Sequence, residues 1–317
     1  MNPIFARMKI LIICSCTRGK VSPFIHEQVD ALRELKMNLS YFLIKNKGIT
    51  GYFKSLFELY RRIRNEEFNI IHAHYGLSGL IAVCQRKIPV IITFHGSDVN
   101  NKKIRLFSKI ASRFSAFNIL VEGGFSQKLK LDKNHAIIPC GINLNIFKEK
   151  NYAQVRTSLG INSDEKIILF SSFFNNPVKN FALAKKSVEL SKHKIRLVEL
   201  KQFTREEVSD WMNASDLLLL TSFSEGSPQV VKEAIACRLP VFSTPVGDVV
   251  KLSEYTDGIT IIPYDAEKIA EEIDLFFLRK SRIQHNEIVE KYDNRIIAKQ
   301  IKDLYQRILK KDNENTN

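Results

Sequence analysis

Cysteine is scarce in this sequence of 317 residues, and its five cysteines form no Cys-x-x-Cys pair. A disulfide framework requires many paired cysteines, and a cysteine zinc site requires closely spaced ones. We therefore expect small buried side chains in a reducing compartment rather than cross-links or metal ligands. The five residues are Cys14, Cys16, Cys84, Cys140 and Cys237.

Long apolar runs are absent as well, and so are internal repeats and low-complexity segments. Near the amino terminus, Arg7 and Lys9 precede a short apolar run over residues 10–13. That run is too short for a secretion signal and far too short to span a bilayer. We expect it to form a first parallel strand, and we expect no membrane-spanning segment elsewhere.

Acidic side chains are few relative to basic ones: 34 Asp and Glu residues against 48 Lys and Arg residues give a net charge of +14. The excess is concentrated in the first half, for example at residues 61–64 and 102–105. The sequence over 101–117 predicts a basic amphipathic helix. Such a helix fits an anionic membrane surface, nucleic acid or a simple solvated face. Its apolar side would consist of Ile104, Phe107, Ile110, Ala111 and Phe114.

Apolar runs of strand length alternate with helical patterns along the whole chain, and 44% of the residues are hydrophobic. This alternation predicts doubly wound parallel sheets, and the length allows two α/β domains. The expected strands are 9–15, 69–73, 90–94, 118–121, 136–139, 166–172, 195–199, 217–221, 241–244 and 260–262. The expected helices include 24–35, 52–65, 183–191, 206–213 and 228–237.

The break between the two domains is expected near residues 141–147. We predict an N-terminal domain over 1–147 and a C-terminal domain over 148–285, which would begin with a polar linker and a short helix. A last, basic helix is expected from residue 286, and the segment 286–317 would pack back toward the N-terminal domain.

Two glutamates stand out in the segment 224–234, where Glu225 and Glu233 flank a turn that is expected to open a helix. The apolar run 217–220 precedes this segment and a second run, 240–244, follows it. The order is therefore strand, polar turn, helix and strand. Glu225 would lie above the carboxyl end of its strand, where open α/β sheets bind their ligands.

The turn itself is suited to phosphate. We expect Ser227 to cap the helix and Pro228 to be its first residue. Free amide donors at such a helix start attract phosphate groups. One carboxylate could then hold sugar hydroxyls and the other a ribose, with the phosphates between them.

This segment resembles the nucleotide-sugar site of the retaining glycosyltransferases with the GT-B fold, glycosyltransferase family four. That family carries Glu-Gly-x-Pro followed by a second glutamate at this spacing. The resemblance implies two Rossmann-like doubly wound domains that face a cleft, with the donor bound by the second domain. It further implies that Glu225 contacts the sugar and is catalytic, that Glu233 contacts the ribose, and that the residues between them line the donor site, namely Gly226, Ser227, Pro228 and Val230.

The segment 93–98, Thr-Phe-His-Gly-Ser-Asp, ends a strand and enters a turn. The family has His-Gly-x-Asp or a close variant at this place. The resemblance implies that His95 is catalytic and faces the donor sugar, and that Gly96 and Asp98 belong to the donor site. A glycine allows the backbone to approach a ligand closely. From the residues alone, Asp98 could instead cap the next helix.

His72 and His74 stand two residues apart on an expected strand, so their side chains share one face. His-x-His is also a metal-ligand spacing, and His95 could be a third ligand, which gives the alternative of a metal-dependent hydrolase. Against it, the sequence has no Asp-x-Asp, and the remaining histidines lack spacings that would complete a ligand set. We interpret His74 as an acceptor-side residue and expect no metal and no cofactor.

Lys179 follows the first strand of the second half, where the family has a lysine that contacts the diphosphate. The family usually has an arginine five residues earlier, but this chain has Phe174 there. The resemblance therefore implies donor binding by Lys179 together with the amides of the 226–228 turn. With no metal, fixed positive charge and the helix dipole are the available means to stabilise the leaving diphosphate.

The loop after the first strand contains a single glycine, Gly19, where the family has a glycine-containing loop near both substrates. The resemblance implies that Gly19 lies beside the donor. Its basic neighbours Arg18 and Lys20 would meet an anionic acceptor or the donor phosphates.

Taken together, the motifs imply a retaining, metal-independent hexosyltransferase that uses a nucleotide diphosphate sugar and a glycan acceptor, expected to be lipid-linked. A UDP sugar is expected over GDP-mannose. No separate protein base is visible, so the leaving phosphate would take the acceptor's proton. The nearest alternative is another GT-B enzyme, such as a sugar-nucleotide epimerase or a phosphorylase.

The resemblance also suggests a location. Such enzymes commonly extend lipid-linked glycans on the cytoplasmic leaflet, and the basic helix over 101–117 falls in the acceptor-binding half. We expect a cytoplasmic protein, peripheral on the inner face of a bacterial plasma membrane, that acts in surface polysaccharide assembly such as capsule or lipopolysaccharide. An anionic membrane surface is the expected partner for the excess positive charge, and nucleic acid is not.

Overall fold

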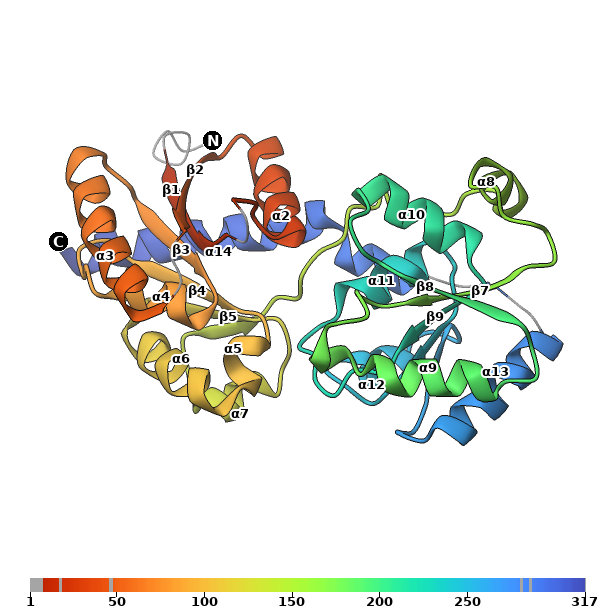
Figure 1. Ribbon diagram of the computed structural model, residues 1–317. Coiled ribbons are helices and arrows are strands. Elements are labelled where there is room, and N and C mark those ends of the chain that lie inside the picture. Colours follow the sequence, from red (N-terminus) through yellow and green to blue (C-terminus); the bar gives the residue numbers. More distant parts are fainter. Residues whose placement is uncertain (1–7, 17–18, 46–47, 280–281, 285–286, 317) are drawn as a thin grey trace. The chain divides into compact units, whose positions relative to one another are not determined.

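The computed structural model describes residues 8–16, 19–45, 48–279, 282–284 and 287–316. The chain divides into two compact units (Figure 1). Unit 1 contains residues 1–141 together with 294–317, and unit 2 contains residues 142–293. Each unit is built around one parallel β-sheet with helices on both faces.

Unit 1 has a parallel sheet in the order β2-β1-β3-β4-β5-β6. Five of its strands match the expected ones closely, and β2 is the strand that the sequence pattern did not predict. The strands are β1 (Lys9–Ser15), β2 (Asn38–Ile44), β3 (Ile70–His74), β4 (Val90–Phe94), β5 (Phe117–Leu120) and β6 (His135–Ile137).

The two faces of this sheet are covered by different helices because side chains alternate along each strand. In β1, Ile10 and Ile12 pack with α2 and α14, whereas Leu11 and Ile13 pack against the opposite cluster. The helices of unit 1 are α2 (Pro23–Glu34), α3 (Gly48–Asn65), α4 (Gly76–Val83), α5 (Ser97–Asn100), α6 (Lys102–Phe114), α7 (Phe125–Leu129) and α14 (Asn294–Thr316).

The last helix, α14, belongs to unit 1 by its packing. Its residues Ile297, Ile301 and Tyr305 are buried in the same cluster as Ile10 and Val29. It begins at residue 294, eight residues later than expected. The preceding 3-10 helix η2 (Glu287–Tyr292) packs in unit 2 instead.

The chain passes between the units at two adjacent positions. Ile142 pairs with Asp293 in a parallel bridge, and the Ile142 amide donates to the Tyr292 carbonyl at 2.7 Å. The boundary falls at 141/142 rather than at 147/148 because Phe147 is fully buried in the core of unit 2.

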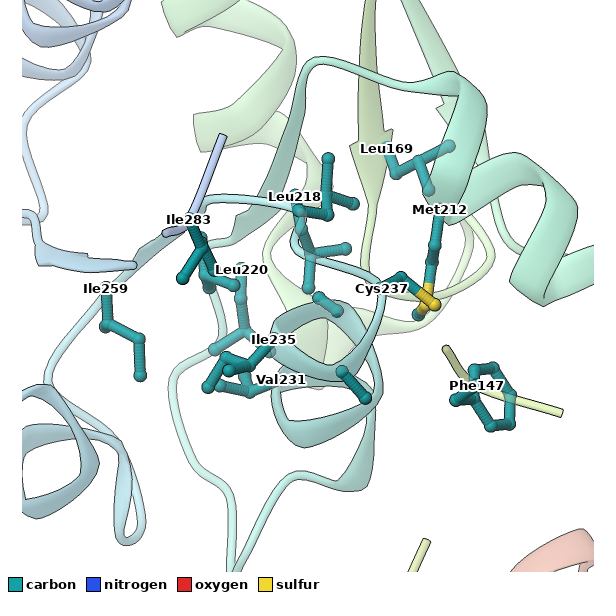
Figure 2. Close-up of a cluster of buried hydrophobic side chains, with 14 of the residues drawn as sticks. Phe147, Leu169, Met212, Leu218, Leu220, Val231, Ile235, Cys237, Ile259 and Ile283 are labelled. Carbon is teal, nitrogen blue, oxygen red and sulfur yellow. The ribbon is translucent and has the colours of Figure 1, made fainter. Parts of the chain in front are cut away.

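Unit 2 has a parallel sheet in the order β11-β10-β9-β7-β8. In β9, Leu218 and Leu220 face one hydrophobic cluster, while Leu217 and Leu219 face the other. Figure 2 draws the first cluster, in which Val231 of α11 packs with Leu218 and Leu220. The strands are β7 (Lys166–Phe170), β8 (Ile195–Glu199), β9 (Leu217–Leu220), β10 (Val241–Ser243) and β11 (Ile259–Ile261).

The helices of unit 2 lie on both faces of its sheet. Those carrying the first cluster include α10 and α11, and those carrying the second are α9 and α13. They are α8 (Tyr152–Ser158), η1 (Pro177–Lys179), α9 (Phe181–Leu190), α10 (Arg205–Ala214), α11 (Gln229–Ala236), α12 (Val249–Ser253) and α13 (Ala266–Arg279). Within the described ranges, none of the helices is long and apolar enough to cross a membrane.

Both sheets have a strand order that reverses once, between β1 and β3 in unit 1 and between β7 and β9 in unit 2. In open α/β sheets, ligands bind beyond the carboxyl ends of the strands at such a point. The loops that leave β7 and β9 carry Lys179 and Glu225, and the end of β3 carries His74. The topology therefore brings the sequence motifs to the expected edge of each sheet.

Candidate active site

Glu225 and Lys179 form an ion pair where β7 and β9 end. The Lys179 Nζ lies 2.7 Å from the Glu225 Oε1, and both side chains are mostly buried. The two loops are tied together by their backbones, since the Phe223 amide donates to the Val178 carbonyl and the Thr221 hydroxyl to the Lys179 carbonyl. Two of the predicted donor-site residues are therefore brought together within unit 2.

Glu233, in the middle of α11, is only 2% exposed and is paired with Arg205. Both guanidinium Nη atoms bond the two carboxylate oxygens, Nη1 at 3.5 Å from Oε2, and the guanidinium lies over the Phe147 ring at 4.5 Å. Arg205 was missed in the sequence. Its signal was the capping box of Thr204 and Glu207, which starts α10 directly after the β8 loop.

The prediction that Ser227 caps the helix is wrong. Helix α11 begins at Gln229 with Pro228 as its extended N-cap residue, and no side chain caps it. The Ser227 hydroxyl is occupied otherwise, because it donates to the Asp248 Oδ2 at 2.5 Å and accepts a hydrogen bond from the Lys232 Nζ. Serine here ties the turn to a neighbouring loop instead of to the helix.

The turn at Gly226 is held from the side by the 247–248 loop. The Asp248 amide donates to the Gly226 carbonyl at 3.2 Å. Gly247 has a φ of +56°, and a Cβ there would stand 2.1 Å from the same carbonyl, so only glycine fits. Val230, one residue into α11, is half-buried against the core of unit 2.

Phe174 stands where the resemblance led us to look for an arginine, and the structure gives it a packing role. Its ring stacks on Phe181 at 4.0 Å and lies 5.7 Å from Phe170, in the hydrophobic cluster of the second face. Its amide donates to the Glu199 Oε2. The position therefore contributes no charge to the loop.

In unit 1, His95 lies at the end of β4 in an aromatic surround. Its ring centroid is 4.9 Å from Phe24 and 4.7 Å from Tyr75. Its Nε2 is 3.0 Å from the His74 Nδ1, and its Nδ1 is 3.6 Å from the Cys140 Sγ. Burial and the neighbouring His74 hold the pKa of His95 well below 6.5, so the ring is neutral near pH 7.

His72 and His74 share a face of β3, as predicted, and their rings stack at 4.6 Å. Both ring nitrogens of His72 are engaged, with the Tyr305 hydroxyl at 2.6 Å and the Thr93 hydroxyl at 2.7 Å. Burial lowers the pKa of His74 to about 3. His72 is therefore part of a hydrogen-bonded core. Across the described residues, no group of three His, Cys, Asp or Glu side chains is arranged to hold a metal ion.

Asp98 is 2% exposed and accepts backbone hydrogen bonds from two loops. Its Oδ1 receives the amides of His95 and Gly96 at 3.1 and 2.9 Å, and its Oδ2 receives the Gly76 amide at 2.9 Å. Gly96 adopts a φ of +125°, which favours glycine. Both carboxylate oxygens are therefore hydrogen-bonded to backbone amides and hold the His95 turn. This geometry does not support direct contact between Asp98 and a donor.

The loop after β1 holds the remaining predicted residues. Gly19 has a φ of +79° with open space around its α-carbon, and Lys20 is exposed. Arg18 lies outside the described residues. The structure therefore offers Gly19 and Lys20 to solvent at the carboxyl edge of the unit 1 sheet.

Comparison with known proteins places these features in a family context. The family described as "Glycosyltransferase Family 4" matches residues 16–145, and the one described as "Glycosyl transferases group 1" matches residues 171–277. A Bacillus subtilis glycosyltransferase assigned to teichuronic acid biosynthesis is 30% identical over 257 residues, which cover 69% of this chain. The chain spans 62% of the length of that relative.

Two solved structures resemble the whole fold. Sucrose-phosphate synthase from Thermosynechococcus elongatus superimposes with a TM-score of 0.80 at 16% identity, covering 95% of this chain and 99% of the other. Anabaena HepE, solved in complex with UDP and glucose, gives a TM-score of 0.77 at 15% identity, covering 95% and 100%. At such identities the likeness concerns the fold.

Proposed function

The chain belongs to glycosyltransferase family 4, among the group 1 glycosyltransferases, and has the GT-B fold; from this we propose that it transfers a sugar from a nucleotide diphosphate sugar to a glycan acceptor with retention of configuration. The observation that carries the proposal is the pairing of Glu225 with Lys179 where β7 and β9 end. A carboxylate for sugar hydroxyls and a cation for phosphate then stand side by side in the loops that bind ligands in this fold.

Each motif residue has a role in this proposal. Lys179 binds the diphosphate and Glu225 the transferred sugar, so the donor replaces their mutual ion pair. Glu233 is assigned to the ribose hydroxyls, to which Arg205, now bonded to both carboxylate oxygens, would give up part of its contact. His95, neutral in its aromatic surround, contacts the donor sugar through hydrogen bonds.

The chemistry assigned to this site is orientation and charge stabilisation. We assign neutralisation of the leaving diphosphate to Lys179 and to the backbone amides of Gly226 and Ser227 rather than to a metal ion. The bond from the anomeric carbon to the diphosphate breaks, the acceptor oxygen attacks the same face, and the leaving phosphate takes the acceptor's proton. His74 and Lys20 are assigned to the acceptor side.

The relatives support the proposed donor and acceptor classes. Anabaena HepE is solved with UDP and glucose and with UDP-glucose, which supports a UDP sugar as donor. The Bacillus subtilis relative assigned to teichuronic acid biosynthesis supports a role in a surface polysaccharide. We extend this to a lipid-linked glycan acceptor at the inner face of a bacterial plasma membrane, in capsule or lipopolysaccharide assembly.

A thermal-shift panel with UDP, GDP, ADP and CMP in chelator tests this proposal. A nucleotide at a hundred times its Kd stabilises the protein by about 2.7 kcal/mol, or several degrees in Tm. We expect UDP to give the largest shift and chelator to leave it unchanged. A shift that requires added divalent metal, or none with any nucleotide, would contradict the proposed donor site.

An exposed apolar surface on unit 1 supports the proposed location. Helix α6 packs on the unit through small residues, Ser108, Ala111 and Ser112, and a Cβ at Gly76 would clash with Ser108. Its apolar side, expected from the sequence, is therefore largely exposed to solvent instead of buried. The exposed apolar residues on α6 are Leu106 (61%), Phe107 (43%), Ile110 (41%) and Phe114 (54%).

Helix α3 adds a second exposed aromatic group, Phe53 (61%) and Phe57 (73%). The two helices are linked through the end of α4, because the Tyr60 hydroxyl donates to the Cys84 carbonyl and the Arg86 guanidinium lies over the Phe114 ring at 5.1 Å. Aromatic side chains among basic ones suit an anionic lipid interface. We propose that this surface binds the membrane.

Vesicle co-sedimentation at low salt tests the membrane proposal. We expect binding to anionic but not to zwitterionic vesicles. The double variant Phe107→Ser, Phe114→Ser should bind roughly thirtyfold more weakly, or weaker still, since each aromatic side chain contributes on the order of 1 kcal/mol or more at such an interface. Leu278→Ser, which removes a side chain 78% exposed on α13 of unit 2, is the matched control. Equal binding by both variants, or none by the wild type, would refute the proposed surface.

A further inference from the structure

Lys232, the fourth residue of α11, is completely buried, with 0% of its surface exposed. Burying an ammonium group away from water is costly unless close partners compensate for it. Neither the spacing of the two motif glutamates nor the proposed roles of Glu225 and Glu233 account for a lysine beside Glu233. Its burial therefore calls for a function of its own.

The partners of Lys232 converge on the turn that precedes the helix. Its Nζ donates to the Ser227 hydroxyl, lies 3.4 Å from the Asp248 Oδ2, and stands 4.5 Å above the Tyr292 ring. Helical side chains point toward the amino terminus of their helix, so a lysine at this position extends beneath the 226–228 turn. A carboxylate and an aromatic face both attract an ammonium group.

The hydrogen bonds run in one direction through this cluster. Lys232 donates to Ser227, and Ser227 donates to the Asp248 Oδ2 at 2.5 Å. The other oxygen, the Asp248 Oδ1, is buried and has no hydrogen-bond partner among the residues that the structure describes. Asp248 therefore divides a single carboxylate oxygen between the lysine and the serine, and the lysine is not locked in a close two-point ion pair.

The position of this charge matters because the loop after β7 supplies only one cation at the site, Lys179. Phe174, five residues before it, is packed against Phe170 and Phe181 and provides none. The charge of a diphosphate exceeds that of one lysine. Lys232, whose charge is shared with Asp248 at 3.4 Å, would supply part of the positive charge that the Phe174 position lacks.

We propose that Lys232 is a phosphate-positioning residue: it places positive charge beneath the Gly226–Pro228 turn for the donor diphosphate, and it fixes that turn through the Ser227 hydroxyl. This inference rests on the proposed function of the same site. A purely structural role would lower the affinity for all ligands of the site, whereas the proposed role lowers the affinity only for ligands that carry phosphates.

Binding of UDP and of uridine to the full chain, measured by isothermal titration, separates these roles. In Lys232→Met, which keeps the length of the side chain but removes its charge, we expect UDP affinity to fall by roughly tenfold or more and uridine affinity to stay within about twofold. Lys251→Met, which removes an exposed lysine of α12, is the matched control and should change neither affinity.

Ser227→Ala provides a second test that leaves the lysine in place and remains informative if Lys232→Met does not fold. This variant should also lower the affinity for UDP more than that for uridine, but by a smaller factor than Lys232→Met does. Equal losses for both ligands, or no loss for UDP, in either folded variant would overturn the inference while leaving the proposed function intact. Failure of the wild type to bind any nucleoside diphosphate would overturn the proposed function, and this inference with it.

Discussion

Glu225→Gln is expected to lower the rate of sugar transfer by about 10²–10³-fold while UDP affinity changes by no more than a few-fold. Glu225 lies in the loop after β9 and faces Lys179, so its carboxylate is assigned to the transferred sugar rather than to the nucleotide. Glutamine keeps the size of the side chain but removes the charge that favours an electron-poor anomeric carbon. Single-turnover rates and UDP titrations on the same preparation give the two quantities.

Glu233→Gln is the matched comparison, with the opposite pattern. This variant should lower the affinities for UDP and for uridine by similar factors, because it removes a buried partner of Arg205 and the proposed contact to the ribose. Glu254→Gln, at an exposed position in the same unit, serves as the inert control. If Glu225→Gln retained the wild-type rate, or if Glu233→Gln lost only turnover, the assignment of the two carboxylates would have to be exchanged or abandoned.

The order of strands and helices was largely predictable because alternation of apolar runs is a local property. β1, β4 and β8 match their expected bounds, and others differ by one or two residues. The missed strand, β2, lies at the edge of its sheet, pairs only with β1, and begins four residues after α2 ends. An edge strand has a half-buried pattern, which is hard to distinguish from a loop next to a helix.

The site was predictable where one motif contains its own chemistry, as with Glu225 and Glu233. Lys179 was expected at the donor site, but its ion pair with Glu225 was not, and neither was the partner Arg205. These contacts span 46 and 28 residues of sequence. Sequence periodicity also identified the apolar side of α6 without showing whether another element covers it. The helix packs on the unit through Ser108, Ala111 and Ser112. Of the expected apolar side, Ala111 is therefore fully buried, whereas Phe107, Ile110 and Phe114 stay exposed.

The function of Asp98 is a further example of what sequence alone left open. The residue follows the family pattern, and two interpretations fitted it, a donor contact or a turn anchor. Only the three-dimensional structure brings the Gly76 amide, 22 residues away, to the same carboxylate as the His95 and Gly96 amides. A backbone amide from another loop leaves no periodicity in the sequence by which it could be anticipated.

Acid is expected to destabilise unit 1 between pH 7 and pH 5 because its core contains neutral histidines. Burial holds the pKa values of His72 and His95 well below 6.5 and lowers that of His74 to about 3, whereas all three titrate normally once unfolded. The stabilising contribution of each neutral histidine is complete above pH 6.5 and is lost as the pH falls below it; for His74 the loss is about 2 kcal/mol at pH 5. Asp98 opposes this, since burial raises its pKa to about 6 and protonation then favours the folded state by roughly 1 kcal/mol.

The loss from the three histidines exceeds the gain from Asp98, so scanning calorimetry at pH 7, 6 and 5 should show a drop in Tm of several degrees. His74→Gln replaces a titrating ring by a neutral amide, so the variant should lose less stability over this range than the wild type, even if it starts from a lower Tm. His26→Gln is the matched control, because the His26 side chain is 58% exposed on α2. If the wild type and His74→Gln lost the same stability in acid, His74 would not be the neutral, buried partner of His95 that the structure describes. The proposed hydrogen-bonding role of His95 would then lose its support.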